Sequence, residues 1–133
     1  MAEALFRSTF LDAGDEVRSV QSAGIGALVG EGASEHSHFL MAERGIDISG
    51  HVARQLGESL VNWADLILVM ERFQQDEIQH RYPAARGKVF LLGHWSDTEI
   101  ADPYKKGLAE FRTALEQIET GVFKWCEKIV ANK

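Results

Sequence analysis

Cysteine is nearly absent from this sequence, which holds a single one, Cys126, among 133 residues. One cysteine cannot form an internal disulfide, and without paired Cys or Cys/His spacings there is no thiolate zinc site. The histidines also lack a carboxylate at ligand spacing on a shared helical face. We therefore predict no metal and no cofactor, and this use of cysteine favours a reducing, cytoplasmic location.

Basic residues and long apolar runs are scarce as well. Lys and Arg number 14 against 20 Asp and Glu, which gives a net charge of −6 at pH 7. No run of Lys and Arg forms the stripe that would neutralise a nucleic-acid backbone. No apolar stretch approaches the roughly 18 residues of a membrane span, and the start MAEALFRSTF has no signal-peptide pattern. We expect neither a nucleic-acid partner nor membrane insertion.

The residues that are present suit one compact domain over residues 1–133, with a hydrophobic content of 45%. Apolar spacing predicts helices at residues 1–11, 34–44, 52–60, 71–80 and 105–130. Shorter apolar runs predict strands at residues 17–22, 65–70 and 88–92. The run DLILVM at residues 65–70 is typical of a strand covered on both faces. The alternation predicts an α/β fold, a parallel sheet with helices on both faces.

The tripeptide Asp102-Pro103-Tyr104 follows the last predicted strand and has two interpretations. Asp-Pro is common in ordinary turns, where it carries no chemistry. Alternatively, the proline stiffens a loop that holds a carboxyl group over a pocket, where the group could protonate a leaving oxygen. The tripeptide alone leaves both interpretations open.

Five segments add weight to the second interpretation, because they occur in the order and approximate spacing of one family. They are SAGIGALVGEG (22–32), GIDISGHVARQL (45–56), ADLILVMERF (64–73), RGKVFLLGHW (86–95) and EIADPYKKG (99–107). The chain resembles the low-molecular-weight protein tyrosine phosphatases along nearly its whole length. The GHVARQ and GHW segments are similar to the subgroup encoded with capsule and exopolysaccharide export machinery.

The resemblance implies a four-stranded parallel sheet flanked by helices and metal-free hydrolysis of phosphotyrosine. In the family a cysteine thiolate attacks phosphorus, an arginine and backbone amides hold the oxygens, and an aspartic acid protonates the phenolate. Asp102 matches that acid, and Tyr104 matches the aromatic wall of the cleft. Leu28 matches a residue bordering the cleft, and Ser22 and His51 match groups that brace the phosphate loop from behind. The implied partner is a phosphotyrosine protein, the tyrosine-rich tail of a membrane tyrosine kinase that controls polysaccharide export.

The sequence departs from the family at its start. Members begin with an apolar strand and a C-x5-R-S loop, whereas no C-x5-R occurs here and MAEALFR matches the residues after that loop. We expect an N-terminally truncated domain that lacks the first strand and is inactive as it stands, because nucleophile and anion cradle are missing. Cys126 is expected to be a packing thiol of the last helix. Sheet edges exposed beside the absent strand could lead to self-association.

Three functions stay open at this point. Met1 is an internal methionine of a working phosphatase, or the short chain is a non-catalytic, phosphatase-derived binding module. The third, arsenate reductase on the same fold, is the least favoured, because it needs additional cysteines to pass a disulfide along.

Overall fold

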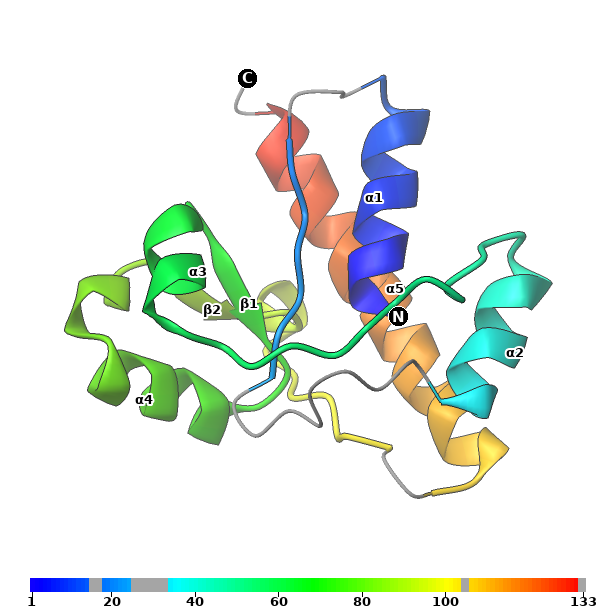
Figure 1. Ribbon diagram of the computed structural model, residues 1–133. Coiled ribbons are helices and arrows are strands. Elements are labelled where there is room, and N and C mark those ends of the chain that lie inside the picture. Colours follow the sequence, from blue (N-terminus) through cyan, green and yellow to red (C-terminus); the bar gives the residue numbers. More distant parts are fainter. Residues whose placement is uncertain (15–17, 25–33, 104–105, 132–133) are drawn as a thin grey trace.

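The computed structural model describes residues 1–14, 18–24, 34–103 and 106–131. Five α-helices, two β-strands and two 3₁₀ turns follow one another in this described part of the chain (Figure 1). In order they are α1 (Ala2–Asp12), α2 (Glu35–Glu43), α3 (Glu58–Trp63), β1 (Ile67–Val69), α4 (Arg72–Arg81), η1 (Pro83–Ala85), β2 (Val89–Leu91), η2 (His94–Ser96) and α5 (Leu108–Ala131).

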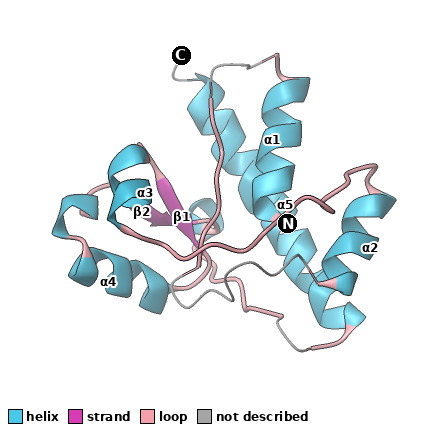
Figure 2. Cartoon of the chain, viewed as in Figure 1, coloured by secondary structure: helices cyan, strands magenta, loops and turns pink. Residues whose placement is uncertain are grey.

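The two strands form a parallel pair in which Ile67 lies opposite Val89 and Val69 opposite Leu91. Successive side chains of a strand point to opposite faces, and both faces here are apolar. Leu68 and Phe90 pack toward α1 and α5. The side chains that pack toward α3 and α4 are those of Ile67, Val69, Val89 and Leu91. Figure 2 shows the strands between these two groups of helices. The predicted α/β fold with a parallel sheet flanked by helices is therefore confirmed.

Two sequence-based expectations are wrong. Residues 18–23 form no strand, and their segment pairs only through an isolated bridge between Gly24 and Gln55. A strand needs a neighbour along its length, and the sheet of the described residues consists of β1 and β2 alone. The helix expected at residues 52–60 begins only at Glu58, because the backbone before it pairs with Gly24 instead: Leu56 N–H donates to Gly24 O at 2.8 Å.

The long helix α5 lies directly on the carboxyl end of β2. The buried Trp125 indole N–H donates to the carbonyl oxygens of Leu91 and Leu92 at 3.1 and 3.0 Å. One turn earlier, a Cβ added to Gly121 would lie 2.8 Å from both Leu92 Cγ and Leu92 O. Glycine is thus required for this close approach. Of the helices in the described part of the chain, none combines the length and apolar composition needed to cross a membrane.

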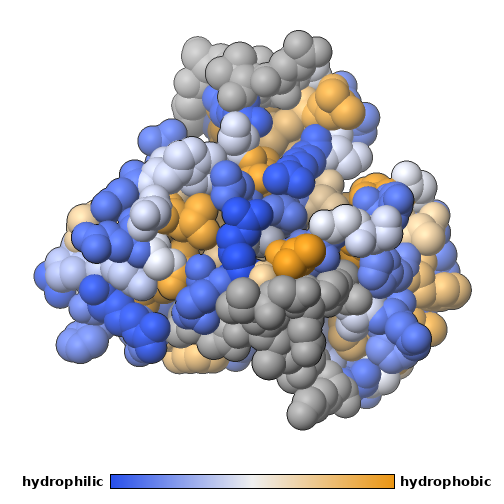
Figure 3. Space-filling view, in the orientation of Figure 1, coloured by the Kyte–Doolittle hydropathy of each residue, from blue (hydrophilic) through white to orange (hydrophobic). Residues whose placement is uncertain are grey.

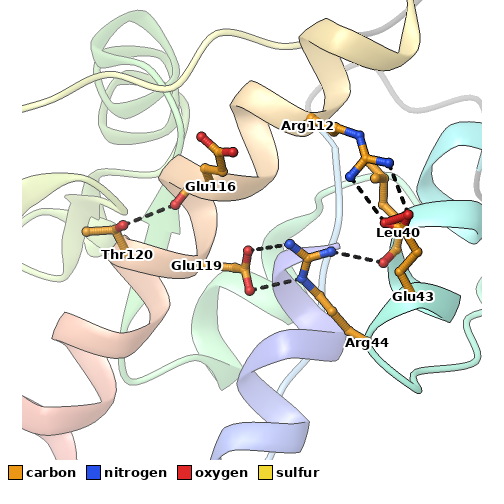
Figure 4. Close-up of polar contacts among 7 residues, drawn as sticks. All are labelled: Leu40, Glu43, Arg44, Arg112, Glu116, Glu119 and Thr120. Carbon is orange, nitrogen blue, oxygen red and sulfur yellow. Dashed lines mark hydrogen bonds and ion pairs between the residues drawn. The ribbon is translucent and has the colours of Figure 1, made fainter.

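Two pairs of charged side chains join α2 to α5 (Figure 4). Arg44 donates from Nε and Nη2 to both carboxylate oxygens of Glu119, at 3.0 and 2.7 Å. Arg112 on α5 makes the reciprocal two-pronged contact with Glu43, at 3.2 and 3.0 Å. The hydrogen bond from Arg112 lowers the pKa of Glu43, and that to Glu119 raises the pKa of Arg44. These contacts fix where the chain leaves α2 toward residues 45–51.

The close approach at Gly121 predicts the effect of one methyl group. Gly121→Ala improves helix propensity by about 1 kcal/mol, but the new Cβ meets the Leu92 carbonyl, which Trp125 holds in place. We expect a net loss of about 1–3 kcal/mol in the free energy of unfolding, measured by urea denaturation. The matched control is Gly50→Ala, where the added Cβ meets nothing within 4 Å. Equal stability of the two variants would contradict this account.

Candidate active site

The carboxyl edge of the sheet is where the chain brings its candidate catalytic residue. After β1, the Met70 and Glu71 amides donate to the Gln74 side chain at 3.0 and 3.1 Å. The carbonyl of Met70 accepts the amide of Ile100 at 2.9 Å. In open parallel sheets, ligands bind outside the carboxyl ends of the strands. Ile100 therefore fixes Asp102, two residues further on, at the edge where a substrate would lie.

The chain reaches this edge through a tight reversal after β2. The Thr98 amide donates to Gly93 O at 3.0 Å, and a Cβ on Gly93 would collide with the Thr98 carbonyl oxygen. Within the reversal Asp97 adopts a left-handed conformation with φ of 48°. Only glycine permits the approach at position 93, and the reversal returns the chain toward β1.

A second anchor joins the same loop to the start of α4. Glu99 Oε1 accepts the backbone N–H of Arg72 at 2.7 Å, so its carboxylate satisfies an amide of the first turn of α4. The Arg72 guanidinium lies 3.4 Å from Glu99 Oε2 and 2.7 Å from Asp97 Oδ1. We call these three residues the Arg72 clamp. No local sequence signal indicates the clamp, because Asp97 and Glu99 lie 25 and 27 residues after Arg72 in the sequence.

Beyond the clamp, Asp102 is exposed and the following Pro103 is half-buried. The Lys106 amide donates to Pro103 O at 2.8 Å and closes a turn before α5. Asp102 is thus an exposed residue of a loop whose backbone is anchored on both sides. Two of the predicted cleft residues, Tyr104 and Leu28, lie outside the described residues.

The two predicted bracing residues lie near the beginning of α1 and in the segment beside it. His51 Nδ1 lies 3.6 Å from Glu3 Oε2, an ion pair when the imidazole is protonated. The sequence did not indicate Glu3, whose side chain is 13% exposed and also lies 3.6 Å from Arg7. Ser22 is half-buried, two residues before Gly24, whose amide donates to Arg54 O at 3.0 Å. The Gly24 contact joins the segment of Ser22 to the chain that follows His51.

Cys126 lies in the core against α1 and is unsuited to nucleophilic attack. It is buried at 5% exposure, and burial raises the pKa of its thiol to about 11, against a smaller opposing effect of Arg18. The group stays protonated near neutral pH, as expected for a packing thiol. Among the described residues, no group of three or more His, Cys, Asp or Glu side chains could hold a metal ion.

Parallel strands between two helical layers define an α/β domain, and the anchored loop of Asp102 makes their carboxyl edge the candidate ligand site. The family described as low molecular weight phosphotyrosine protein phosphatase matches residues 1–133. The chain belongs to this family, which is one of enzymes, and the resemblance read from the sequence is confirmed.

Individual relatives agree with the family. The chain is 50% identical over 131 residues to a probable low molecular weight protein-tyrosine-phosphatase, EpsP, of Ralstonia nicotianae, covering 98% of this chain and 87% of EpsP. The crystal structure of Erwinia amylovora tyrosine phosphatase AmsI matches with a TM-score of 0.87 and 36% identity, over 96% of this chain and 82% of AmsI. The YwlE arginine phosphatase of Geobacillus stearothermophilus matches with a TM-score of 0.89 and 30% identity, over 98% and 84% of the two chains.

The Arg72 clamp predicts how firmly the Asp102 loop is held. Glu99→Ala removes both the ion pair and the acceptor of the Arg72 amide. We expect the Ile100 amide to exchange with solvent about tenfold faster, because losing a hydrogen bond to a charged group costs about 1.5 kcal/mol. Arg72→Ala should have a smaller effect, since its ion pairs are half-exposed and worth little alone. Hydrogen exchange followed by NMR measures both.

The control for this experiment is Arg81→Ala. That substitution removes an exposed ion pair with Glu77 on the same helix, at 2.8 Å, without touching the loop. If the three variants left Ile100 exchange unchanged or altered it equally, the clamp would not anchor the loop.

Proposed function

We propose that this chain carries the acid/base part of a protein tyrosine phosphatase that works through a cysteinyl-phosphate intermediate. The observation that carries the proposal is the position of Asp102, exposed on an anchored loop at the carboxyl edge of the sheet, in a member of this family. A carboxyl group there can donate a proton to a leaving oxygen and later accept one from water.

In the proposed reaction a thiolate attacks phosphorus as the bond from phosphorus to the phenolic oxygen breaks, and Asp102 donates its proton to that oxygen. Water then attacks the cysteinyl-phosphate, the Asp102 carboxylate accepts the proton, and the sulfur leaves as thiolate with release of phosphate. The thiolate and the phosphate-binding arginine come from a C-x5-R-S segment, which this sequence does not contain. We propose that the chain alone is inactive; a role as a non-catalytic binding module is the alternative.

The sheet of the working enzyme is proposed to have four parallel strands, with the strand before C-x5-R-S between residues 18–24 and β1. In an extended segment successive backbone groups face opposite edges. Both the N–H and the C=O of Gly24 face residues 54–56, so those of Ala23 and Gln21 face the other way. Without a strand on that edge, the exposed backbone could pair with a second copy.

The proposed substrate is a phosphotyrosine protein in the cytoplasm, with the tail of a membrane tyrosine kinase of polysaccharide export as the partner. Support comes from the family and from the relative named EpsP. A phenolic ring can stack on an aromatic wall while phosphoserine is too short to reach the base of a deep pocket. The likeness to an arginine phosphatase makes phosphoarginine the second candidate substrate.

The proposed role of Asp102 predicts a dependence on the leaving group. The chain alone should not hydrolyse p-nitrophenyl phosphate above buffer, whereas a version extended by a strand and C-x5-R-S should. In the extended version, Asp102→Asn should lower kcat by roughly 10²- to 10⁴-fold on aryl phosphates with poor leaving groups, and less on acidic ones. Asp76→Asn, an exposed change on α4, is the control. An equal loss across leaving groups would limit Asp102 to a structural role.

The substrate class is tested with peptides of one sequence that carry phosphotyrosine, phosphoserine or phosphoarginine. We expect the extended version to show a kcat/KM on phosphotyrosine at least 10²-fold above that on phosphoserine. Comparable rates on these two would defeat the aromatic-wall argument. A higher rate on phosphoarginine would replace the proposed substrate.

A further inference from the structure

A hollow of about 540 Å³ lies beside α1 and the segment of residues 18–21. It is bounded by Arg7 and Leu11 of α1, by residues 18–21 and by Arg54. Three arginines from three separate parts of the chain thus line one depression, which we call the arginine groove. Figure 1 shows residues 18–21 in the upper half of the view, whereas residues 101–103 lie in the lower half. The described lining of the groove shares no residue with the Asp102 loop or the Arg72 clamp.

Each guanidinium of the groove donates to at least one uncharged oxygen. Arg7 Nη2 donates to Val20 O at 2.6 Å, and Arg54 Nη1 donates to the Gln21 side chain at 2.7 Å. Because Val20 and Gln21 are consecutive, these two bonds bring α1 and the chain after His51 to the same short segment. Arg18 Nη2 donates to Ile129 O of α5 at 3.3 Å. A guanidinium has five N–H donors, so these bonds orient the groups of Arg7 and Arg54 without using all of their donors.

The charge around the groove is unlike that of the rest of the chain. The sequence carries a net charge of −6, yet none of the described residues that line the groove is acidic. Arg7 also lies 3.6 Å from the carboxylate of Glu3 on the same helix. Arginine stays charged at any physiological pH. The like charges of Arg7 and Arg54 repel each other, and a bound anion relieves that repulsion.

Figure 3 shows strongly hydrophilic side chains gathered in the middle of this face, over segment 18–24 and the adjoining part of α1. The planar donor fork of arginine matches the oxygens of phosphate better than a lysine ammonium does. Ser19 and Gln21 add uncharged donors to the lining. The volume falls in the range of small-ligand sites and exceeds what a bare phosphate fills, so there is room for the organic group of an ester.

We propose that the arginine groove is a second phosphate site, which binds the phosphate group of a monoester through Arg7 and Arg54. The ester can be a phosphotyrosine side chain or a small sugar phosphate, and inorganic phosphate shares the same chemistry. The proposal does not depend on the proposed function, because it involves neither Asp102 nor a nucleophile.

The experiment uses the chain as given, whose sequence has no C-x5-R. Phosphate bound to it is therefore not bound in a catalytic phosphate loop. Titration calorimetry and NMR of the arginine Nε–H signals measure binding of inorganic phosphate, of N-acetyl-phosphotyrosine amide and of glucose 1-phosphate at low and high salt. We expect saturable binding of at least one probe, weaker at high salt, with shifts in the signals of Arg7 and Arg54.

The variants separate fork recognition from net charge. Arg7→Gln with Arg54→Gln should weaken binding at least tenfold, and Arg54→Lys should weaken it several-fold although the charge is kept. Arg86→Gln, an exposed arginine outside the groove, is the control and should bind as the parent does. Urea denaturation confirms that each variant is folded.

The three probes decide the source of the phosphate. Tightest binding of the phosphotyrosine probe assigns the site to a protein partner, tightest binding of the sugar phosphate assigns it to a small metabolite, and equal binding of all three assigns it to phosphate itself. Absence of saturable binding for every probe, or binding that the Arg7 and Arg54 changes do not weaken, would overturn the proposal.

Discussion

The contact between α5 and the end of β2 is the constraint on which the rest of the described structure depends. Trp125 supplies a hydrogen-bond donor to the carbonyls of Leu91 and Leu92, at the point where β2 ends and its own ladder stops. Buried carbonyls need such partners, and the indole ring fills the space at the same time. Gly121 has no Cβ, and a Cβ at this position would keep α5 from approaching Leu92 so closely. The reversal at Gly93 starts from this fixed end of β2, so the same contact also restrains where the loop of Asp102 begins.

The candidate site is built from contacts between distant parts of the chain. The Ile100 amide donates to the Met70 carbonyl, and the Glu99 carboxylate accepts the backbone N–H of Arg72 at the start of α4. The first anchor uses the Met70 carbonyl, directly after β1, and the second uses the Arg72 amide in the first turn of α4; neither uses Asp102 itself. The arrangement leaves Asp102 exposed while the backbone on either side is restrained, a combination suited to a group that must meet a substrate in one geometry.

Sequence patterns predicted the helices with strong periodicity and the two strands with continuous apolar runs, because burial on one or both faces leaves a direct trace in residue spacing. A strand was also predicted at residues 17–22, but residues 18–22 form none, because pairing depends on a neighbouring strand that the pattern of one segment does not report. Asp102 was found through five ordered segments rather than through its own tripeptide. Arg72 and Glu3 were missed, because an ion pair across the fold has no fixed spacing along the chain.

The two charged contacts between α2 and α5 have a consequence for alignment. The consecutive residues Glu43 and Arg44 carry opposite charges. Glu43 pairs with Arg112 and Arg44 pairs with Glu119, and these two partners lie about two turns apart on α5. If α2 slid along α5 by that distance, Glu43 would meet Glu119 or Arg44 would meet Arg112, and like charges would oppose the shift. Exposed pairs contribute little to stability, but this order of charges favours one alignment of α2 along α5 over the shifted alignments. The end of α2, where the chain toward His51 begins, is therefore positioned by repulsion between like charges in shifted alignments as well as by attraction in the observed one.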